Sequence, residues 1–298
     1  MATVLDPAAV AAAFRAELRA EIASLPEPLV VVGFLASEHG PSATYAEYTR
    51  KGCDDVGARF ELRHVPRLDA EAAIRAANED RGVHGMLVYY PIFGTGQDNY
   101  LRSLVDPLKD IEGLNPFWAR CLYENRRFLD EAKTKKAILP CTPLAMIKLL
   151  DAAGCAVLGQ ARPLAGKKIC VFNRSEVVGR PLASMLSNDG AEVFSFDIDG
   201  PQLFVPAPID GAHEVREISV DRETALAQAD IVITGIPGGS FKLISPREIK
   251  PGAVCMNFST VKNFEDSIVD AASVLIPRVG PMTVTMALRN AVRLYRNR

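Results

Sequence analysis

Short apolar segments alternate with helical segments along most of the chain, and this alternation constrains its fold more than any other feature. The runs PLVVVGFLA (28–36) and KKICVFN (167–173) are compact and apolar, as buried parallel strands are. Repeated βα units of this kind predict doubly wound parallel sheets, and therefore an α/β fold. The expected strands are 28–36, 58–65, 84–91, 167–173, 191–198, 230–237, 252–258 and 273–277, and the expected helices are 42–57, 68–80, 98–105, 141–154, 177–190, 223–229 and 283–298.

The length of 298 residues favours about two domains. A second series of βα units starts at Gly166, and the stretch 200–220, rich in Pro and Gly, interrupts it. We expect this stretch to be a long loop. At the N-terminus, Asp6 and Pro7 predict a helix start, with Asp6 as the N-cap.

Composition limits the class of protein. A hydrophobic content of 48% is enough for two packed cores, and a net charge of −2 without a basic stripe argues against nucleic-acid binding. No apolar run is long enough to predict a membrane span. The six cysteines are scattered without a CxxC pair and only four histidines accompany them, so we expect reduced thiols, no metal site and a cytoplasmic protein.

The segment NRSEVVGRP (173–181) joins an expected strand to an expected helix. Rossmann units carry GxGxxG at this turn, and here only Gly179 remains of the three glycines. An ordinary βα turn is the alternative interpretation. A helix N-terminus at this point would still offer free N–H groups to a pyrophosphate.

Asp197 ends the next expected strand, 18 residues after Gly179. A carboxylate in this position accepts hydrogen bonds from a ribose 2′-hydroxyl and repels a 2′-phosphate, which favours NAD over NADP. Asp199 is the alternative candidate. Arg174 could hold a 2′-phosphate, pair with Asp197, or contact the pyrophosphate.

The segment SATYAEYTRKGCDDVG (42–57) places Ser42 and Thr49 about one helical turn on either side of Tyr45. This face carries no acid, no base and no nucleophile with an evident activator. It can line a pocket that binds and orients a ligand. The alternative is an ordinary half-buried tyrosine on a helix.

Five segments together resemble the methylenetetrahydrofolate dehydrogenase/cyclohydrolase family, and most closely its monofunctional NAD-dependent branch. They occur in the family's order. The resemblance implies a folate-binding catalytic domain (1–145 plus 281–298), a Rossmann domain that binds NAD (146–280), a folate cleft between the two, and a homodimer formed through the Rossmann domains. The segments are YYPIFG (89–94), KDIEGLN (109–115), LPCTPLA (139–145), NRSEVVGRPLA (173–183) and VGPMTVTMALRN (279–290).

The resemblance also implies a lost activity. Bifunctional members carry a lysine four residues after the tyrosine, where this chain has Thr49, and a glutamine where it has Tyr89. Lys51 cannot replace that lysine, because a position six residues after Tyr45 points about 120° away on a helix. Hydrolysis needs a group that moves a proton, and a threonine hydroxyl does not do this at neutral pH.

By resemblance, Asp110 and Glu112 should accept N–H bonds from the pterin, although the family usually has aspartate at the position of Glu112. The alternative is a solvated turn in which Lys109 pairs with an acid. Cys141 is expected to pack at a helix entry and not to act as a nucleophile. The residues expected at the catalytic centre are Tyr45, Thr49, Asp110 and Glu112. Those expected to bind substrate are Ser42, Tyr89, Pro91, Pro281, Met282 and Thr283. Those expected to bind the cofactor are Asn173, Arg174, Ser175, Val178, Gly179, Asp197, Ile198, Thr234, Gly235, Ile236 and Thr260.

The implied reaction is hydride transfer from 5,10-methylenetetrahydrofolate to NAD in one-carbon metabolism, a route that feeds purine biosynthesis. The first alternative is a bifunctional dehydrogenase/cyclohydrolase that uses another residue for hydrolysis. A nucleotide-binding regulator with an inactive site is a second, and the presence of Asp110 and Glu112 argues against it. A third is a shikimate-type or amino-acid-type dehydrogenase, which leaves the five segments unexplained.

Overall fold

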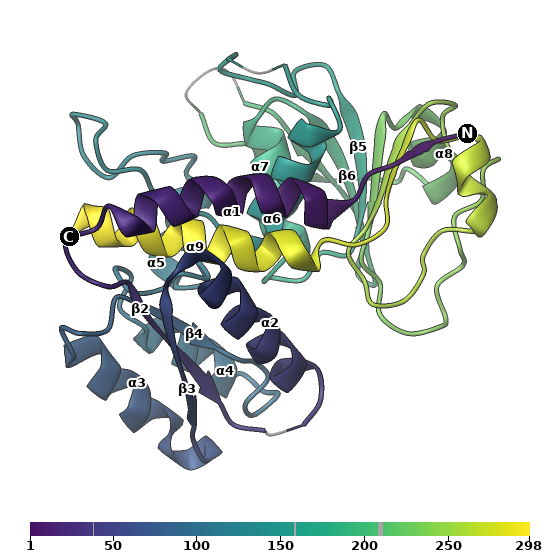
Figure 1. Ribbon diagram of the computed structural model, residues 1–298. Helices are drawn as coiled ribbons and strands as arrows, with labels where there is room; N and C mark the ends of the chain where they lie inside the picture. Colours follow the sequence, from purple (N-terminus) through teal and green to yellow (C-terminus); the bar gives the residue numbers. More distant parts are fainter. Residues whose placement is uncertain (38, 158, 208–210) are drawn as a thin grey trace. The chain divides into compact units, whose positions relative to one another are not determined.

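The computed structural model describes residues 1–37, 39–157, 159–207 and 211–298. The chain divides into two compact units, each a sheet with helices packed on it, as expected for the α/β class (Figure 1). Unit 1 contains Met1–Val10, Leu122–Asn125 and Thr142–Met282, and unit 2 contains Ala11–Cys121, Arg126–Cys141 and Thr283–Arg298.

Unit 1 has an eight-stranded sheet in the order β1-β11-β10-β9-β5-β6-β7-β8, parallel from β1 to β6. The chain leaves the central strand β5 towards β6 and later returns to β9 on the other side of β5. Ligands of such sheets bind where the strand order reverses, at the carboxyl ends of the strands. The strands are β1 (Thr3–Val4), β5 (Lys168–Phe172), β6 (Glu192–Asp197), β7 (Gly200–Val205), β8 (Glu214–Glu217), β9 (Ile231–Thr234), β10 (Val254–Asn257) and β11 (Val274–Ile276).

The prediction of a long loop at 200–220 is wrong. Strands β7 and β8 form an antiparallel hairpin that extends the sheet beyond β6, with Phe204 opposite Val215. Phe204 is completely buried, so the hairpin contributes to the core. Pro and Gly in this segment hid the alternation that would have predicted a strand. Residues 208–210 of the expected loop lie outside the described residues.

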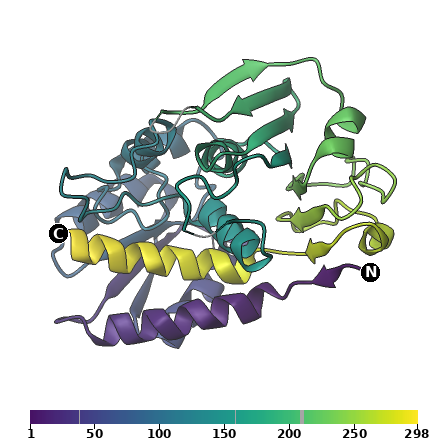
Figure 2. The same cartoon turned by 90° about the horizontal axis from the view of Figure 1, so that it is seen from above.

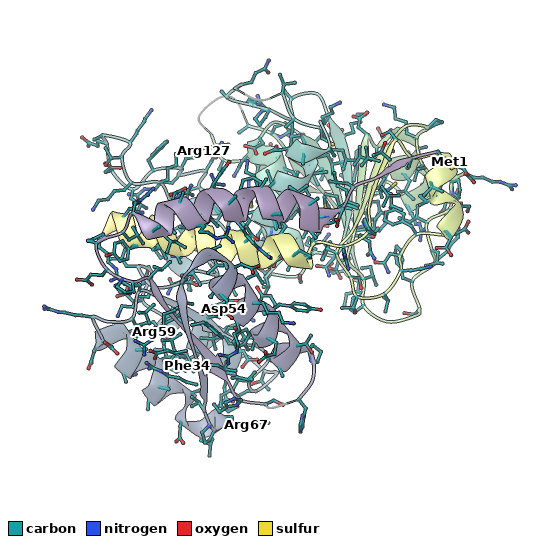
Figure 3. All side chains as sticks on the ribbon, viewed as in Figure 1. Met1, Phe34, Asp54, Arg59, Arg67 and Arg127 are labelled. Carbon is teal, nitrogen blue, oxygen red and sulfur yellow. The ribbon has the colours of Figure 1, made fainter. Side chains whose placement is uncertain are left out.

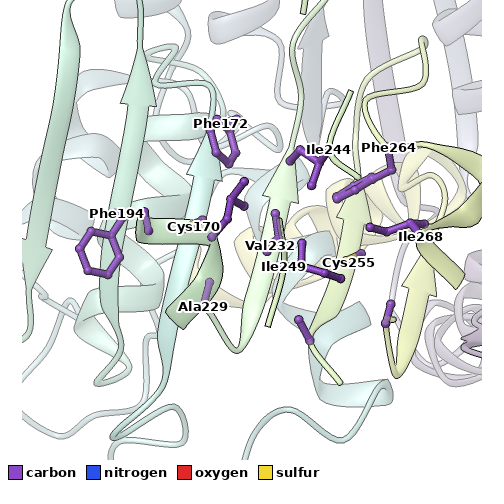
Figure 4. Close-up of a cluster of buried hydrophobic side chains, with 14 residues drawn as sticks. Cys170, Phe172, Phe194, Ala229, Val232, Ile244, Ile249, Cys255, Phe264 and Ile268 are labelled. Carbon is purple, nitrogen blue, oxygen red and sulfur yellow. The ribbon is translucent and has the colours of Figure 1, made fainter. Parts of the chain in front are cut away.

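One core of unit 1 lies on a face of the central strands (Figure 4). Cys170, Val232 and Cys255 project from β5, β9 and β10, and Ile268 of the 3₁₀-helix η2 (Asp266–Asp270) packs with them. These two cysteines are completely buried, so they act as small apolar residues. The helices of unit 1 are α7 (Gly179–Asn188), α8 (Arg222–Gln228) and nearly all of α6 (Cys141–Ala152).

Unit 2 has a three-stranded parallel sheet, β3-β2-β4, with β2 (Val30–Leu35) in the centre. Phe34, labelled in Figure 3, belongs to its core together with Ile74 and Leu101. The flanking strands are β3 (Arg59–His64) and β4 (Gly85–Val88). The helices are α2 (Pro41–Val56), η1 (Arg67–Asp69), α3 (Ala70–Glu79), α4 (Gln97–Leu104), most of α5 (Pro116–Tyr123), and most of α1 (Pro7–Ala23) and α9 (Gly280–Asn297).

Helices α1 and α9 lie side by side (Figures 1 and 2), and Arg15 Nε donates to Thr285 Oγ1 at 3.1 Å. Asp6 accepts the Ala8 N–H at 3.0 Å, which confirms the predicted cap. Helix α9 begins at Gly280, three residues before its expected start, so the GPMT motif forms its first turn. No helix in the described part of the chain is long and apolar enough to cross a membrane.

Candidate active site

Helix α2 presents the tyrosine of the candidate folate site in unit 2. Pro41 starts the helix, and Gly57, at φ 79°, ends it by donating to the carbonyls of its last turn. Its buried face includes Thr49 and Gly52. A Cβ at Gly52 would lie 2.5 Å from Val284 Cγ1, so the glycine allows α2 to approach α9 closely.

Neither hydroxyl beside Tyr45 is directed at a ligand. Thr49 is 1% exposed, and its Oγ1 donates to the Tyr45 carbonyl at 2.9 Å. Ser42 Oγ donates to the Tyr90 carbonyl at 3.1 Å. Lys51 is exposed, as its position on the helix predicts. The expectation that Thr49 and Ser42 offer polar contacts to substrate is therefore not supported by their hydrogen bonds.

The Tyr45 ring meets the Tyr89 ring edge to face, with centroids 5.7 Å apart and an interplanar angle of 83°. Tyr89 follows β4 and is 3% exposed. A Cβ at Gly33 would lie 2.8 Å from the Tyr89 ring, so Gly33 makes room for it. Burial raises the pKa of both tyrosines, and the neighbouring Cys141 thiol raises that of Tyr45 further. The pair is neutral at physiological pH.

Asp110 organises the loop that follows the segment pairing with β4. It is 4% exposed, and its two oxygens accept the N–H groups of Glu112, Gly113 and Asn115 at 3.2, 3.1 and 2.6 Å. These bonds use the carboxylate within the loop. Asp110 therefore positions the loop, which differs from its expected role as a pterin partner. The alternative, a pairing of Lys109 with an acid, is also wrong: Lys109 Nζ donates to three backbone carbonyls, two in the last turn of α3 and one just after the helix.

Glu112 is the acid of this loop that remains available. Its Oε2 accepts the Val88 N–H at 3.1 Å, and the side chain is half-buried. Burial raises the pKa of Glu112 to about 8, the Asp110 carboxylate raises it as well, and Val88 and Arg102 oppose the rise. Burial also raises the pKa of Asp110 to about 6.

Helix α9 fixes the loop from the other side. Asn290 is completely buried, and its Nδ2 donates to the carbonyls of Ile111 and Leu139 at 3.0 and 2.9 Å. Gly113, at φ 72°, passes so close to Leu139 that a Cβ would lie 2.8 Å from its carbonyl. Asn290 was not among the residues predicted for the site. Asn290 lies four residues after Met286 and four before Leu294, and a polar residue on such an apolar helix face is the signal that could have found it.

The remaining residues expected to touch substrate are Pro91, after β4, and Pro281, Met282 and Thr283, in the first turn of α9. Pro91 is exposed after β4. Pro281 is half-buried in the first turn of α9, whereas Met282 is completely buried and Thr283 is 5% exposed. Met282 therefore supports this turn from within. The Cys141 thiol, expected only to pack, lies against the Tyr45 hydroxyl.

In unit 1, the 173–179 turn lies at the carboxyl end of β5. Asn173 has a φ of 135°, and its Oδ1 accepts the N–H and the hydroxyl of Ser175 at 2.9 and 2.7 Å. A Cβ at Gly179 would overlap the Asn173 carbonyl oxygen, so only glycine fits at the start of α7. Val178 precedes this glycine as the N-cap residue of α7 and makes no side-chain cap bond.

The acids after β6 have different partners. Asp197 accepts the backbone N–H groups of Arg174 and Ile198. The Arg174 guanidinium is buried, pairs with Asp199, and donates to the carbonyls of Ser195 and Gly200 at 2.8 and 2.9 Å. The Arg174 side chain thus pairs with Asp199 rather than with Asp197, and it links the end of β6 to the turn after it. The Ile198 side chain is fully exposed beside Asp197.

The turn after β9 lies next to the 173–179 turn, because β5 and β9 are neighbours. Asn173 Nδ2 donates to the Gly235 carbonyl at 3.0 Å. Thr234 is completely buried, and the Ile236 N–H donates to Asn263 Oδ1 at 2.9 Å. Thr260 is exposed in the loop after β10. The structure thus brings the expected cofactor residues to one edge of the sheet.

The residues at this edge fit a dinucleotide. The space at Gly179 lets the backbone approach a pyrophosphate, α7 directs its free N–H groups there, and Asp197 stands at the position of a ribose-binding acid. The described residues contain no group of three His, Cys, Asp or Glu side chains that could hold a metal ion.

A dinucleotide turn at the reversal point of a doubly wound sheet defines the class of nucleotide-binding α/β proteins. Within this class, the chain belongs to the tetrahydrofolate dehydrogenase/cyclohydrolase family. Residues 5–112 match the model of the family's catalytic domain, and residues 140–204 match that of its NAD(P)-binding domain.

Curated relatives extend the likeness over most of the chain. A methylenetetrahydrofolate dehydrogenase [NAD(+)] of Saccharomyces cerevisiae is 43% identical over 278 residues, 90% of this chain and 86% of that protein. A protein of the same name from Dictyostelium discoideum is 42% identical over 98% of this chain and 94% of its own length. The solved NAD-dependent 5,10-methylenetetrahydrofolate dehydrogenase of S. cerevisiae has a TM-score of 0.92 at 38% identity, covering 99% and 98% of the two chains.

Proposed function

We propose that this chain is an enzyme that oxidises 5,10-methylenetetrahydrofolate to the methenyl form by hydride transfer to NAD, without efficient cyclohydrolase activity. One observation carries the proposal. A chain 42–43% identical to proteins named methylenetetrahydrofolate dehydrogenase [NAD(+)] has a tyrosine-and-acid site in unit 2 and a dinucleotide turn in unit 1.

The substrate supplies the driving force for the oxidation. Its one-carbon bridge lies between two nitrogens, whose lone pairs stabilise the cation left when the hydride departs. The protein therefore needs no base for this step, and it acts by orienting the substrate and excluding water. NAD, when bound, supplies the hydride acceptor.

Three side chains would orient the folate. Tyr45, held edge to face by Tyr89, offers an aromatic surface to the substrate rings. Glu112 would accept two N–H bonds from the pterin, since one of its oxygens is free of the Val88 bond. Asp110 would hold the loop that carries Glu112. Pro91, Pro281 and Thr283 are proposed to border the substrate.

The cofactor preference rests on Asp197. Its carboxylate is proposed to accept the ribose 2′-hydroxyl of NAD and to repel the 2′-phosphate of NADP. Arg174 supports this assignment, because its guanidinium is already occupied by Asp199 and two carbonyls. The turn residues Asn173, Ser175, Val178 and Gly179 would hold the pyrophosphate. Ile198, Thr234, Gly235, Ile236 and Thr260 are the remaining proposed cofactor contacts.

The absence of hydrolysis rests on the α2 face. Thr49 has replaced the lysine of bifunctional relatives, and its hydroxyl is bound to its own helix. Tyr89 takes the place of the family's glutamine and is buried. No titratable base is therefore present on this face to activate water.

The domain division 1–145 plus 281–298 and 146–280 is part of the proposal. The two compact units support it, with residues 1–10, 122–125, 142–145 and 281–282 grouped differently. We further propose a cytoplasmic homodimer formed through the Rossmann domains that works in one-carbon metabolism and purine biosynthesis.

An initial-rate assay with purified protein, 5,10-methylenetetrahydrofolate and either NAD or NADP tests the function. We expect NADH and methenyl product to rise in equal amounts, with NADP nearly inert. Enzyme-dependent loss of the methenyl product would establish the bifunctional alternative. No reduced cofactor with either nucleotide would refute the dehydrogenase assignment.

A further inference from the structure

Several buried polar groups of unit 2 have no hydrogen-bond partner among the described residues, and two of them belong to side chains lining one small cavity. They are Arg102 Nε on α4 and the Tyr90 hydroxyl, just after β4. Asp110 and Glu112 line the same cavity. Its volume of about 10 Å³ is close to the least that holds one water molecule.

The Arg102 side chain is held in place around this cavity. Its guanidinium lies 4.6 Å from the centroid of the Tyr90 ring, a cation–π contact, and its Nη1 donates to Asn99 Oδ1 at 2.8 Å. Arg102 forms no ion pair with any described carboxylate at direct contact distance. Its charge is therefore available to act on the groups around the cavity.

Glu112 is the group that needs this charge. Protonation turns one carboxyl oxygen into a donor, so the ionised form is the one that can accept two N–H bonds from the pterin and the Val88 N–H as well. Among the groups that shift the Glu112 pKa, Arg102 is the only cation, and it lowers that pKa. The titratable groups that face Glu112 are Asp110 of the same loop, Arg102 of α4, Tyr45 of α2, and Tyr89 and Tyr90 after β4.

We propose that Arg102 and Tyr90 are positioning residues that favour the ionised form of the Glu112 side chain and orient it for the pterin, through a water molecule bound in the cavity they share. The water would accept the Arg102 Nε–H, exchange a hydrogen bond with the Tyr90 hydroxyl, and donate to Glu112. Each orphaned donor would thereby gain a partner. This inference rests on the proposed function, because Glu112 acts there on the folate.

The Arg102→Met variant tests the proposal, with Tyr90→Phe as a milder change that keeps the ring. The matched control is Arg75→Met on α3, since Arg75 is exposed and pairs with Glu71 away from the cavity. The kcat and KM for 5,10-methylenetetrahydrofolate would be measured at saturating NAD between pH 6.5 and 9.5. All variants and the wild type would be compared at each pH.

We expect Arg102→Met to raise KM about tenfold at pH 7, the effect of one pKa unit on Glu112. This loss should vanish near pH 9.5, where Glu112 is ionised without help, while kcat stays unchanged. Tyr90→Phe should shift the profile in the same direction by less, Arg102→Lys should restore most of the affinity, and Arg75→Met should follow the wild type.

A KM increase that is equal at every pH would overturn the proposal, because a direct contact or a packing role gives that result. Unchanged KM in both Arg102→Met and Tyr90→Phe would overturn it as well. If Arg102→Met does not fold, Tyr90→Phe and Arg102→Lys still decide the question. A wild-type protein inactive with folate and NAD would instead refute the proposed function.

Discussion

Thr49 donates its hydroxyl to the backbone carbonyl of Tyr45, 2.9 Å away on the same helix. The residue that has replaced the lysine of bifunctional relatives is thus turned towards its own backbone. This bond fits the proposal that the α2 face binds substrate without a proton-transfer group.

Replacing Thr49 with Val should therefore change little. The bond it removes is local, and the Tyr45 carbonyl can still accept the backbone N–H of the helix. We therefore expect the dehydrogenase kcat/KM to stay within about twofold. The free energy of unfolding should fall by about 1 kcal/mol or less. Kinetics and urea denaturation check this. Tyr45→Ala is the contrasting variant and should lose folate affinity strongly. A large loss of activity in Thr49→Val would mean that the hydroxyl touches substrate.

Asp197→Ser should weaken the preference for NAD. Loss of a charged hydrogen bond costs about 1.5–3 kcal/mol, so the KM for NAD should rise by about tenfold or more while NADP becomes a better substrate. Asp197→Asn is the control for loop structure, since its amide oxygen can still accept the Arg174 N–H. Kinetics with both cofactors give the answer. Unaltered NAD kinetics in both variants would mean that Asp197 does not bind the ribose and that Asp199 is the acid that does.

Gly179→Ala should abolish NAD binding. The added Cβ would overlap the carbonyl oxygen of Asn173, a backbone atom that cannot move without opening the turn. Folate binding to unit 2 should survive, and calorimetry with each ligand separates the two effects. The matched control is Gly96→Ala in unit 2, because no atom lies within 4 Å of its added Cβ. Normal NAD affinity in Gly179→Ala would show that the pyrophosphate lies elsewhere.

The Glu112 carboxyl should make stability depend on pH. Burial raises its pKa from the ordinary value of 4.5 to about 8 in the folded protein. The folded state therefore holds a proton that the unfolded state releases, and stability falls as pH rises from about 4.5 to about 8. Glu112→Gln removes this effect. The Tm of the variant minus the Tm of the wild type should therefore become more positive as pH rises from about 4.5 to about 8.

Thermal unfolding at pH 5 and pH 8.5 measures the difference. Glu71→Gln provides the control, because Glu71 is an exposed partner of Arg75. A Tm difference between Glu112→Gln and wild type that is the same at both pH values would contradict an elevated pKa.

Asn290→Ala should weaken folate binding from a distance. Its side chain donates to the carbonyls of Ile111 and Leu139, and leaving two buried acceptors without partners costs about 1–3 kcal/mol each. We expect a lower Tm and a higher KM for folate, with the KM for NAD unchanged. An equal rise of both KM values would indicate general unfolding instead.

Several features could be predicted because they depend on local sequence. The alternation of apolar runs with helices gave the α/β class, and helical geometry placed Lys51 on the exposed side of α2. The position of Asp197 at the end of β6 followed from the strand pattern in the same way. These properties are set by periods of two and 3.6 residues.

Other features could not be predicted, because they depend on contacts between distant segments. Asp110 reads as an available acid in the sequence, yet its oxygens are used by the loop it precedes. Arg174 was open to three roles until the fold brought Asp199 to it. The β7–β8 hairpin was missed because Pro and Gly interrupt its apolar pattern. Asn290 acts on Ile111, 179 positions earlier in the chain.

The hydrogen bond from Asn290 to the Ile111 carbonyl has a consequence for how the protein is made. The helix that steadies the Glu112 loop belongs to unit 2 but is encoded after nearly all of unit 1. During synthesis, unit 1 can acquire its complete set of strands while unit 2 still lacks α9. The nascent chain would thus complete the sheet that carries the nucleotide turn before α9 emerges to complete the unit that carries Glu112.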